Sequence, residues 1–419
     1  MQAIVLAAGK GTRMRSEKPK VLHEIFGRPM LDYVFEVLGQ VGVRRPVLVV
    51  GAGADQVVRF AGKHAIPVLQ AQQKGTGHAV MMTRRAVASS RGDVLIWPGD
   101  MPLVKVETLR TFIRAHRKEG CAVSVLSAVR EDSAGYGRIL RAGGAFCGIR
   151  EELDASEAER RISEVNTGIY LFQSRFLFSS LKSIRPENQK GEYYLTDTIE
   201  ILSRRGEKLE AFPLASAEEG QGVNSREDLA MATSKINQRM IRVLQASGVT
   251  FMAPEQTFVA PGARIGQDTV IYPWCYIETG VKIGKGCQIG PFAKIRKGSV
   301  IGEGSIVGSF VEVNRSRLGR DVSAKHLAYL GDAVIGDETN IGAGTITANF
   351  DGNKKHLTRI GRRVLVGSDT VFVAPVSVGD GARTGAGSVV TSGTRVRRGE
   401  VVVGVPARPI VKKQTRKQK

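Results

Sequence analysis

The sequence Val259-Ala-Pro-Gly-Ala-Arg-Ile265-Gly-Gln-Asp-Thr-Val-Ile271-Tyr-Pro-Trp-Cys-Tyr-Ile277 places an aliphatic residue at every sixth position. The same register continues to Val313 without a break. A period of six is typical of the hexapeptide repeat, in which each unit forms one short strand and its aliphatic side chain points into a prism. The repeat therefore predicts a left-handed parallel β-helix over residues 251–405.

The repeat changes phase twice after Val313, and we expect a protruding loop at each change. Val313 and Ile335 are 22 residues apart, four more than one coil of three hexapeptides. Thr347 and Ile360 are 13 residues apart, across Asn349-Phe-Asp-Gly-Asn-Lys-Lys355. Loops that leave a solenoid often carry its function. The alternative is that the repeat serves only as a spacer or a trimerisation rod.

The sequence before the repeat has a different character. Residues 1–222 alternate apolar strand-like runs, such as Pro46–Val50 and Val94–Trp97, with stretches of helical period. This alternation predicts a Rossmann-like α/β domain with a mostly parallel sheet. Residues 225–247 have the pattern of one amphipathic helix. We therefore expect four parts: the α/β domain over 1–222, a linker helix over 223–250, the β-helix over 251–405 and a basic tail over 406–419.

A glycine-rich loop follows the first predicted strand. Leu6-Ala-Ala-Gly-Lys-Gly-Thr-Arg-Met14 contains two glycines, at which backbone N–H groups can approach a ligand closely. Lys10, Arg13 and Lys20 can add charge-assisted hydrogen bonds to an anion. The spacing is not that of a Walker A loop. The loop predicts a phosphate-rich ligand, and the alternative is a surface turn with solvated cations.

Composition limits the class of protein. The net charge is +21, but no aromatic-interleaved basic patch or known nucleic-acid module accompanies it. Anionic small-molecule substrates explain a basic surface equally well, so we expect no specific nucleic-acid partner. We also expect no membrane partner, because no apolar stretch is long enough to span a bilayer. The four cysteines show no metal-binding spacing and predict reduced thiols in a cytoplasmic protein.

The loop Leu6–Met14 followed by Lys18-Pro19-Lys20 resembles the signature of sugar-1-phosphate nucleotidylyltransferases. Together with the hexapeptide repeat, the chain resembles the bacterial family that joins N-acetylglucosamine-1-phosphate uridylyltransferase to glucosamine-1-phosphate N-acetyltransferase. The resemblance covers nearly the whole chain. It implies Mg²⁺ as cofactor, UTP and acetyl-CoA as co-substrates, sugar phosphates as the other substrates, and a homotrimer held together by the β-helix.

The resemblance also implies roles for residues of the first domain. Asp100 and Asn224 match the metal ligands, and Arg13 and Lys20 match the cations that stabilise charge on the phosphates. The residues that match the nucleotide and sugar contacts are Leu6, Ala8, Gly9, Lys20, Gln70, Gly75, Thr76, Gly137, Glu151, Asn166 and Asn224.

In the second domain, His326 matches the general base of the acetyl transfer, because an imidazole has a suitable pKa to take the amine proton. Glu312 is a candidate to orient it. The acceptor sugar-phosphate contacts match Arg296, Tyr329 and Asn340. The acetyl-CoA contacts match Ala343, whose N–H would stabilise the oxyanion, and Asn349, Phe350, Ser368 and Ala386.

Four positions depart from the family pattern: Pro98 and Phe350 replace tyrosines, Asn314 replaces a lysine, and Gly404 replaces an arginine. Arg315 is a candidate to compensate for Asn314. Two alternatives follow. The chain could use another sugar, base or acceptor amine, or its β-helix could be a non-catalytic scaffold.

Overall fold

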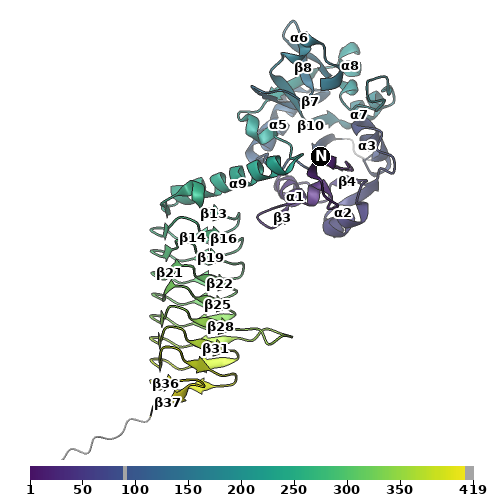
Figure 1. Cartoon of the computed structure of the whole chain (residues 1–419). Coiled ribbons are helices and arrows are strands. Elements are labelled where there is room, and N and C mark those ends of the chain that lie inside the picture. Colours follow the sequence, from purple (N-terminus) through teal and green to yellow (C-terminus); the bar gives the residue numbers. More distant parts are fainter. Residues whose placement is uncertain (88–91, 411–419) are drawn as a thin grey trace, which may run out of the picture. The chain divides into compact units, whose positions relative to one another are not determined.

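The computed structural model describes residues 1–87 and 92–410, and the chain divides into two compact units, Met1–Thr233 and Ser234–Lys419 (Figure 1). Residues 411–419 of the expected basic tail lie outside the described residues.

The first unit is built on one twisted sheet. Its strands, in spatial order, are β11 (Leu209–Pro213), β7 (Val123–Val129), β10 (Glu164–Gln173), β6 (Asp93–Pro98), β1 (Gln2–Ala7), β4 (Val47–Val50) and β5 (Ile66–Leu69). Within this order only β10 runs antiparallel to its neighbours. A hairpin of β8 (Arg138–Ala142) and β9 (Ala145–Arg150) extends from β10, and β2 (Glu24–Ile25) pairs with β3 (Arg28–Pro29). The prediction of a mostly parallel sheet is confirmed.

Helices cover both faces of this sheet. They are α1 (Met30–Gln40), α2 (Ala54–Ala61), α3 (Thr76–Met82), α4 (Arg84–Val87), α5 (Val106–Glu119), α6 (Glu157–Arg160), α7 (Ser174–Leu181) and α8 (Asp197–Arg204). One apolar core lies between the sheet and α1, α2 and α5, and a second lies between the sheet and α3, α7 and α8. Central strands are apolar on both sides because both faces are buried. The carboxyl ends of β1 and β6 stay open, where ligands of α/β sheets bind.

The helix predicted over 225–247 is observed as α9 (Arg226–Ala246). A reciprocal cap begins it: the Ser225 N–H donates to the Asp228 carboxylate at 2.8 Å, and the Asp228 N–H donates to the Ser225 hydroxyl at 3.1 Å. At its other end, Ile241 and Leu244 belong to the same buried cluster as Phe251 and Val259 of the first coil. The end of α9 therefore closes the apolar interior of the β-helix.

The second unit is a parallel β-helix with three flat faces, in agreement with the hexapeptide period. The first face contains β12 (Thr250–Phe251), β15 (Val270–Ile271), β18 (Gln288–Ile289), β21 (Ile306–Ser309), β24 (Ser323–His326), β27 (Asn340–Ile341), β30 (Leu365–Val366), β33 (Arg383–Thr384), β36 (Val401–Val403) and β37 (Arg408–Pro409). The second face contains β13 (Phe258–Val259), β16 (Tyr276–Ile277), β19 (Lys294–Ile295), β22 (Glu312–Asn314), β25 (Tyr329–Gly331), β28 (Ile346–Ala348), β31 (Val371–Val373) and β34 (Val389–Val390). The third face contains β14 (Arg264–Ile265), β17 (Lys282–Ile283), β20 (Val300–Ile301), β23 (Arg317–Leu318), β26 (Ala333–Ile335), β29 (Thr358–Ile360), β32 (Val376–Val378) and β35 (Arg395–Val396).

The prediction of a protruding loop at the first phase change is wrong. Leu318, Ala324 and Leu330 point inward between Val313 and Ile335, so the 22 residues are four repeat units of five, six, six and five residues. The two short units turn through Arg315 (φ 50°) and Asp332 (φ 46°), which adopt the left-handed conformation. The coil therefore tightens at this point and does not open into a loop.

The loop at the second phase change is confirmed. Between β28 and β29 the chain leaves the coil and returns, and an antiparallel bridge joins Phe350 to Lys355 at its base (Figure 1). Asp351 accepts hydrogen bonds from the backbone N–H groups of Asn353 and Lys354, both at 2.8 Å. The His356 ring lies 2.6 Å from the same carboxylate. These contacts give the protruding segment a defined turn.

Candidate active sites

Two predicted metal ligands and a predicted phosphate-binding cation meet at the carboxyl ends of β1 and β6. The Lys20 ammonium donates to the carboxylate of Asp100 and, at 3.0 Å, to Oδ1 of Asn224. All three side chains are far apart in sequence and little exposed. A positive charge is thus already held between two oxygen donors of the kind that Mg²⁺ prefers, so these residues fit that ion.

Local hydrogen bonds fix Asn224 beside Asp100. The Val223 N–H donates to the Asp100 carbonyl at 2.9 Å, and the Asn224 N–H donates to Asp228 at 2.8 Å. The preceding turn is anchored by buried Glu219, which accepts from the Lys105 N–H at 3.1 Å. The start of α9 and the end of β6 therefore hold the two oxygen donors together.

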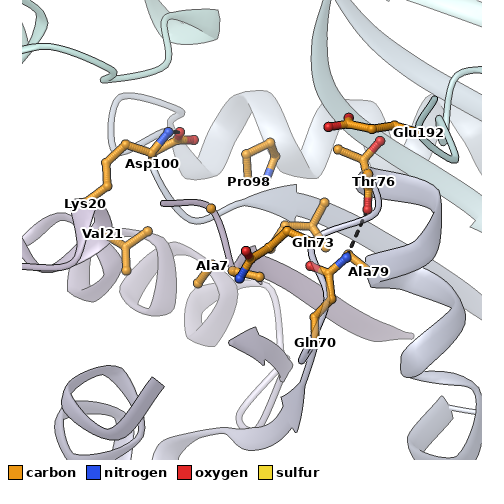
Figure 2. Close-up of a pocket in the computed structure, with 14 residues that line it drawn as sticks. Ala7, Lys20, Val21, Gln70, Gln73, Thr76, Ala79, Pro98, Asp100 and Glu192 are labelled. Atoms are coloured by element: carbon orange, nitrogen blue, oxygen red, sulfur yellow. Dashed lines mark hydrogen bonds and ion pairs between the residues drawn. The ribbon is translucent and has the colours of Figure 1, made fainter. Parts of the chain in front are cut away.

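A cavity of about 300 Å³ opens next to this pair (Figure 2). That volume is at the lower end of the range for small-molecule sites. The predicted residues that line it are Leu6, Ala8, Gly9, Lys20, Gln70, Gly75, Thr76 and Asp100. The other lining residues are Ala7, Val21, Gln73, Ala79, Pro98 and Glu192. The glycine-rich loop and the segment around Gly75 thus form opposite walls of one cavity.

The wall around Gly75 is rigidly held. Gln70 is buried and its side-chain amide donates to the Gly75 carbonyl at 3.1 Å (Figure 2). Gly75 has φ 102°, and a Cβ there would lie 2.5 Å from the Tyr193 carbonyl. The Thr76 hydroxyl accepts from the Leu195 N–H at 3.1 Å. Glycine is therefore required at residue 75, and the loop presents fixed amide groups to a ligand.

A second polar cluster contains the predicted sugar contacts. The Gly137 carbonyl accepts from the Asn166 N–H at 2.8 Å, and the Asn166 amide donates to the Tyr170 hydroxyl at 2.7 Å. Glu151 accepts from the Thr196 hydroxyl at 3.0 Å. A Cβ on Gly137 would lie 3.5 Å from the Glu151 carboxylate. The structure therefore brings Gly137, Glu151 and Asn166 together.

Burial raises the pKa of two carboxyl groups in and beside this cluster. Desolvation raises the pKa of Glu151 above its usual value, and burial together with the charge of Glu151 raises the pKa of Asp197 to about 6. Thr196 and Asp197 are residues of this cluster that sequence reasoning missed. Gly168 links the cluster to the cavity, because a Cβ there would lie 3.1 Å from Pro98.

Arg13 is a predicted residue that the structure brings neither to this cavity nor to the polar cluster around Glu151. It lies in the short 3-10 helix Thr12–Met14 and is exposed, and it is absent from the cavity lining among the described residues.

In the second unit, His326 lies exposed at the end of β24, at the turn between the first and second faces, and not in a loop as expected. The predicted residues Ala343, Ser368 and Ala386 occupy the same turn on the following coils. The Asp369 N–H donates to the Ala343 carbonyl at 2.7 Å, and the Gly387 N–H donates to the Ser368 carbonyl at 2.8 Å. The predicted base and these predicted acetyl-CoA contacts thus form one column.

The predicted acceptor contacts lie on both sides of this column. Tyr329 pairs in register with Glu312 on the second face, and Asn340 is exposed on the first face. Glu312 accepts from Arg296 at 3.0 Å, and among residues 234–410 no hydrogen bond or ion pair joins it to His326. The expectation that Glu312 orients His326 is therefore not supported by a contact, because the carboxylate is held by Arg296.

Asn314 and Asn349 lie at the other edge of the second face. The Asn314 amide lies 3.4 Å from the Tyr329 hydroxyl, and its carbonyl oxygen accepts from Arg315 at 3.1 Å. Arg315 also makes two 2.7 Å hydrogen bonds to Asp332, which accepts from the Asn349 amide as well. Hydrogen bonds from Arg315 hold the pKa of Asp332 below its usual value. Sequence reasoning missed Asp332, which follows Gly331 in the segment already marked by Tyr329.

Comparison with known proteins defines the class. Residues 3–195 match the MobA-like NTP transferase domain, residues 262–297 and 280–315 match the bacterial transferase hexapeptide family, and residues 357–392 match the hexapeptide repeat of succinyl-transferase. A nucleotidyltransferase domain followed by hexapeptide repeats makes this chain a two-domain transferase.

Full-length relatives define the family. The chain is 39% identical over 425 residues to the bifunctional protein GlmU of Bacillus velezensis, covering 93% of each chain. It is 41% identical to that of Syntrophotalea carbinolica over 93% of this chain and 92% of the relative, and 43% identical to that of Pelotomaculum thermopropionicum over 90% of each. The chain belongs to the bifunctional GlmU family.

Proposed function

We propose that this chain catalyses two successive steps of UDP-N-acetylglucosamine synthesis, with each unit carrying one active site. The second unit transfers acetyl from acetyl-CoA to glucosamine-1-phosphate, and the first transfers uridylyl from UTP to N-acetylglucosamine-1-phosphate. The observation that carries the proposal is the presence, in one chain, of the Lys20–Asp100–Asn224 cluster beside a cavity and of the His326 column on a hexapeptide β-helix. Both reactions use cytoplasmic co-substrates, so cytoplasmic location is part of the proposal.

In uridylyl transfer, a sugar-phosphate oxygen attacks the α-phosphorus of UTP and pyrophosphate leaves. Two anions must approach each other, so positioning and positive charge contribute most to catalysis. Asp100 and Asn224 would hold Mg²⁺, which would supply charge at the phosphates. Lys20 supplies further charge at the cavity, whereas the role that the resemblance implies for Arg13 gains no support from the cavity lining. Gln70, Gly75 and Thr76 position the base, while Gly137, Glu151 and Asn166 position the sugar.

In acetyl transfer, the acceptor amine attacks the thioester carbon, a C–N bond forms, and the C–S bond breaks. His326 takes the amine proton, and the coenzyme A thiolate leaves. Ala343, Ser368 and Ala386 lie along the path for acetyl-CoA, with Asn349 and Phe350 at the base of the protruding loop. Arg296, Tyr329 and Asn340 bind the acceptor. Arg296 and Arg315 are both paired with carboxylates, Glu312 and Asp332 respectively, and we assign Arg296 to the acceptor phosphate because it matches the acceptor contact of the family.

We further propose that three copies of the chain assemble through the turn that carries His326. Trp274, Phe292, Phe310 and Leu327 occupy this turn on four successive coils and are each about half exposed. Trp274 stacks on Phe292, and Phe292 stacks on Phe310 at 4.9 Å between ring centroids. We call these four residues the apolar ladder. Exposed apolar surface of this kind is typical of an interface, and a second copy would complete the site beside His326.

The test is thiol release from acetyl-CoA with glucosamine-1-phosphate as acceptor. We expect acceptor-dependent release by the native protein and a loss of about 10²- to 10⁴-fold in His326→Ala, as for removal of a general base. Uridylyl transfer should be unchanged in the same variant. Lys325→Ala, which removes the exposed neighbour on the same strand, should leave both activities intact.

Equal loss of both activities in His326→Ala would contradict the two-site proposal. No release by the native protein, with uridylyl transfer intact, would leave the first site standing and make the β-helix a scaffold or an acyltransferase for another amine. Replacing UTP with other nucleoside triphosphates tests the choice of base.

A further inference from the structure

The third face of the β-helix carries a row of cations that neither proposed reaction uses. The outward positions of its strands are aligned by parallel pairing from β14 to β35. From one end to the other they are Arg264, Lys282, Val300, Arg317, Val334, Arg359, Ser377 and Arg395. All five charged residues are exposed. We call Arg264, Lys282, Arg317, Arg359 and Arg395 the cationic row.

The other two faces differ from this one. The outward positions of the first face include three cations, Lys325, Arg383 and Arg408, and those of the second face include Lys294 and the acidic Glu312. Within residues 234–410, no ion pair or side-chain hydrogen bond is found for any member of the cationic row. Two carboxylates at the adjoining turns are engaged elsewhere: Asp337 with Arg320, and Asp380 with the backbone N–H of Arg362. Positive charge is therefore concentrated on one side of the prism.

This arrangement does not stabilise the fold. Neighbouring strands of a sheet are about 4.8 Å apart, so Arg264 and Lys282 lie directly one above the other, and like charges in that position are destabilising. The remaining members follow at every second coil. A solvated surface selected only for stability would alternate the two signs. The row is instead suited to an anionic partner that supplies the missing counter-charges.

The shape of the third face indicates which kind of anionic partner it can bind. The row is straight, lies on a flat sheet, and has only Val300, Val334 and Ser377 between the cations. No aromatic side chain stands among its outward positions on which single-stranded bases could stack. A plane of anionic headgroups can meet every cation of such a row at once. We propose that the third face binds the surface of an anionic lipid bilayer, without insertion.

This contact is compatible with the proposed assembly. The apolar ladder lies at the turn between the first and second faces, and the third face is opposite that turn in the prism. Copies that associate through the ladder therefore leave their cationic rows uncovered. No helix among residues 1–87 and 92–410 is long and apolar enough to cross a membrane. The proposed contact is peripheral, and it differs from the sequence-based expectation of no membrane partner.

The test is co-sedimentation of the full-length protein with vesicles of 30% phosphatidylserine in phosphatidylcholine, at about 0.1 M salt. The row variant changes all five cations to Gln. The control variant changes five exposed cations of the first unit to Gln: Arg45, Arg59, Lys63, Arg85 and Lys118. Each variant removes five charges, so the formal net charge falls from +21 to +16 in both. Both activities measured in solution should be unchanged in both variants.

We expect native protein to bind these vesicles and not pure phosphatidylcholine, and expect binding to be lost at 0.5 M salt because surface charges are then screened. The row variant should bind at least ten-fold more weakly, and the control variant less than three-fold more weakly. Equal weakening of the two variants would overturn the proposal, since net charge alone would then act. So would binding of a 30-base-pair DNA duplex through the row without binding to vesicles. Loss of activity in the native protein would count against the proposed function and not against this surface.

Discussion

Lys20 contacts more of the proposed nucleotidyl-transfer site than its sequence position suggests. Its ammonium donates to the Asp100 carboxylate and to the Asn224 amide oxygen, which are the two proposed metal ligands. A divalent ion bound by these residues would therefore compete with the Lys20 ammonium for the same oxygen atoms. The competition predicts that Lys20 weakens metal binding to the nucleotide-free protein.

Lys20→Met tests this competition. We expect Mn²⁺, used as a probe for Mg²⁺, to bind the nucleotide-free variant about five-fold or more tightly by calorimetry, because a charge-assisted contact no longer has to be broken. Uridylyl transfer should fall about 10²-fold, since the phosphates lose a stabilising charge. Lys10→Met, an exposed cation of the same loop, is the control and should not change Mn²⁺ affinity. Unchanged affinity in Lys20→Met would contradict the competition.

At the scale of elements, the first coil of the β-helix depends on α9. Asn237 of α9 is 4% exposed, and its amide donates to the Thr257 carbonyl at 2.7 Å. Its carbonyl oxygen accepts from the Val259 N–H at 2.9 Å. An open end of a solenoid would expose its apolar interior, so a repeat structure needs a cap. Asn237 attaches α9 to that end.

Asn237→Ala should destabilise the β-helix by about 2–4 kcal/mol, because two buried backbone groups lose their partners. The readouts are the thermal midpoint of the second unit and the hydrogen-exchange rate of the Val259 amide, which should rise. Gln238→Ala removes the exposed neighbour and should change neither. Rapid hydrogen exchange of the Val259 amide in the native protein would show that its hydrogen bond to Asn237 is not formed in solution.

The structure at the first phase change of the repeat differs from the sequence-based prediction. The spacing between Val313 and Ile335 predicted a loop, whereas two five-residue units preserve the coil. Each short unit needs a left-handed residue, and here Arg315 and Asp332 take that place without glycine. Their ion pair joins the two turns. The pairing is between consecutive coils, so local sequence gave no sign of it.

At the scale of the whole molecule, the proposed trimer depends on the apolar ladder. Phe292→Ser combined with Phe310→Ser removes two stacked rings that are exposed in the single chain. We expect light scattering to show trimers for the native protein and monomers for the variant, with acetyl transfer reduced at least ten-fold and uridylyl transfer retained. Burial of aromatic surface is the driving force that the variant loses.

Leu365→Ser with Val405→Ser, two exposed apolar residues outside the ladder, is the matched control and should remain trimeric. A native protein that is monomeric at micromolar concentration, or a ladder variant that stays trimeric, would contradict this mode of assembly.

The sequence alone determined the two-part architecture, the hexapeptide period, the helix α9 and the glycine-rich loop Leu6–Met14. Each of these depends on the local spacing of apolar residues and glycines. It also marked Lys20, Asp100 and Asn224 through resemblance. Tertiary structure decided what depends on distant residues: that Lys20 lies between Asp100 and Asn224, that Glu312 pairs with Arg296, and that five separate cations line up on one face. These arrangements bring together residues from different elements or coils, and only the folded backbone fixes the distances between them.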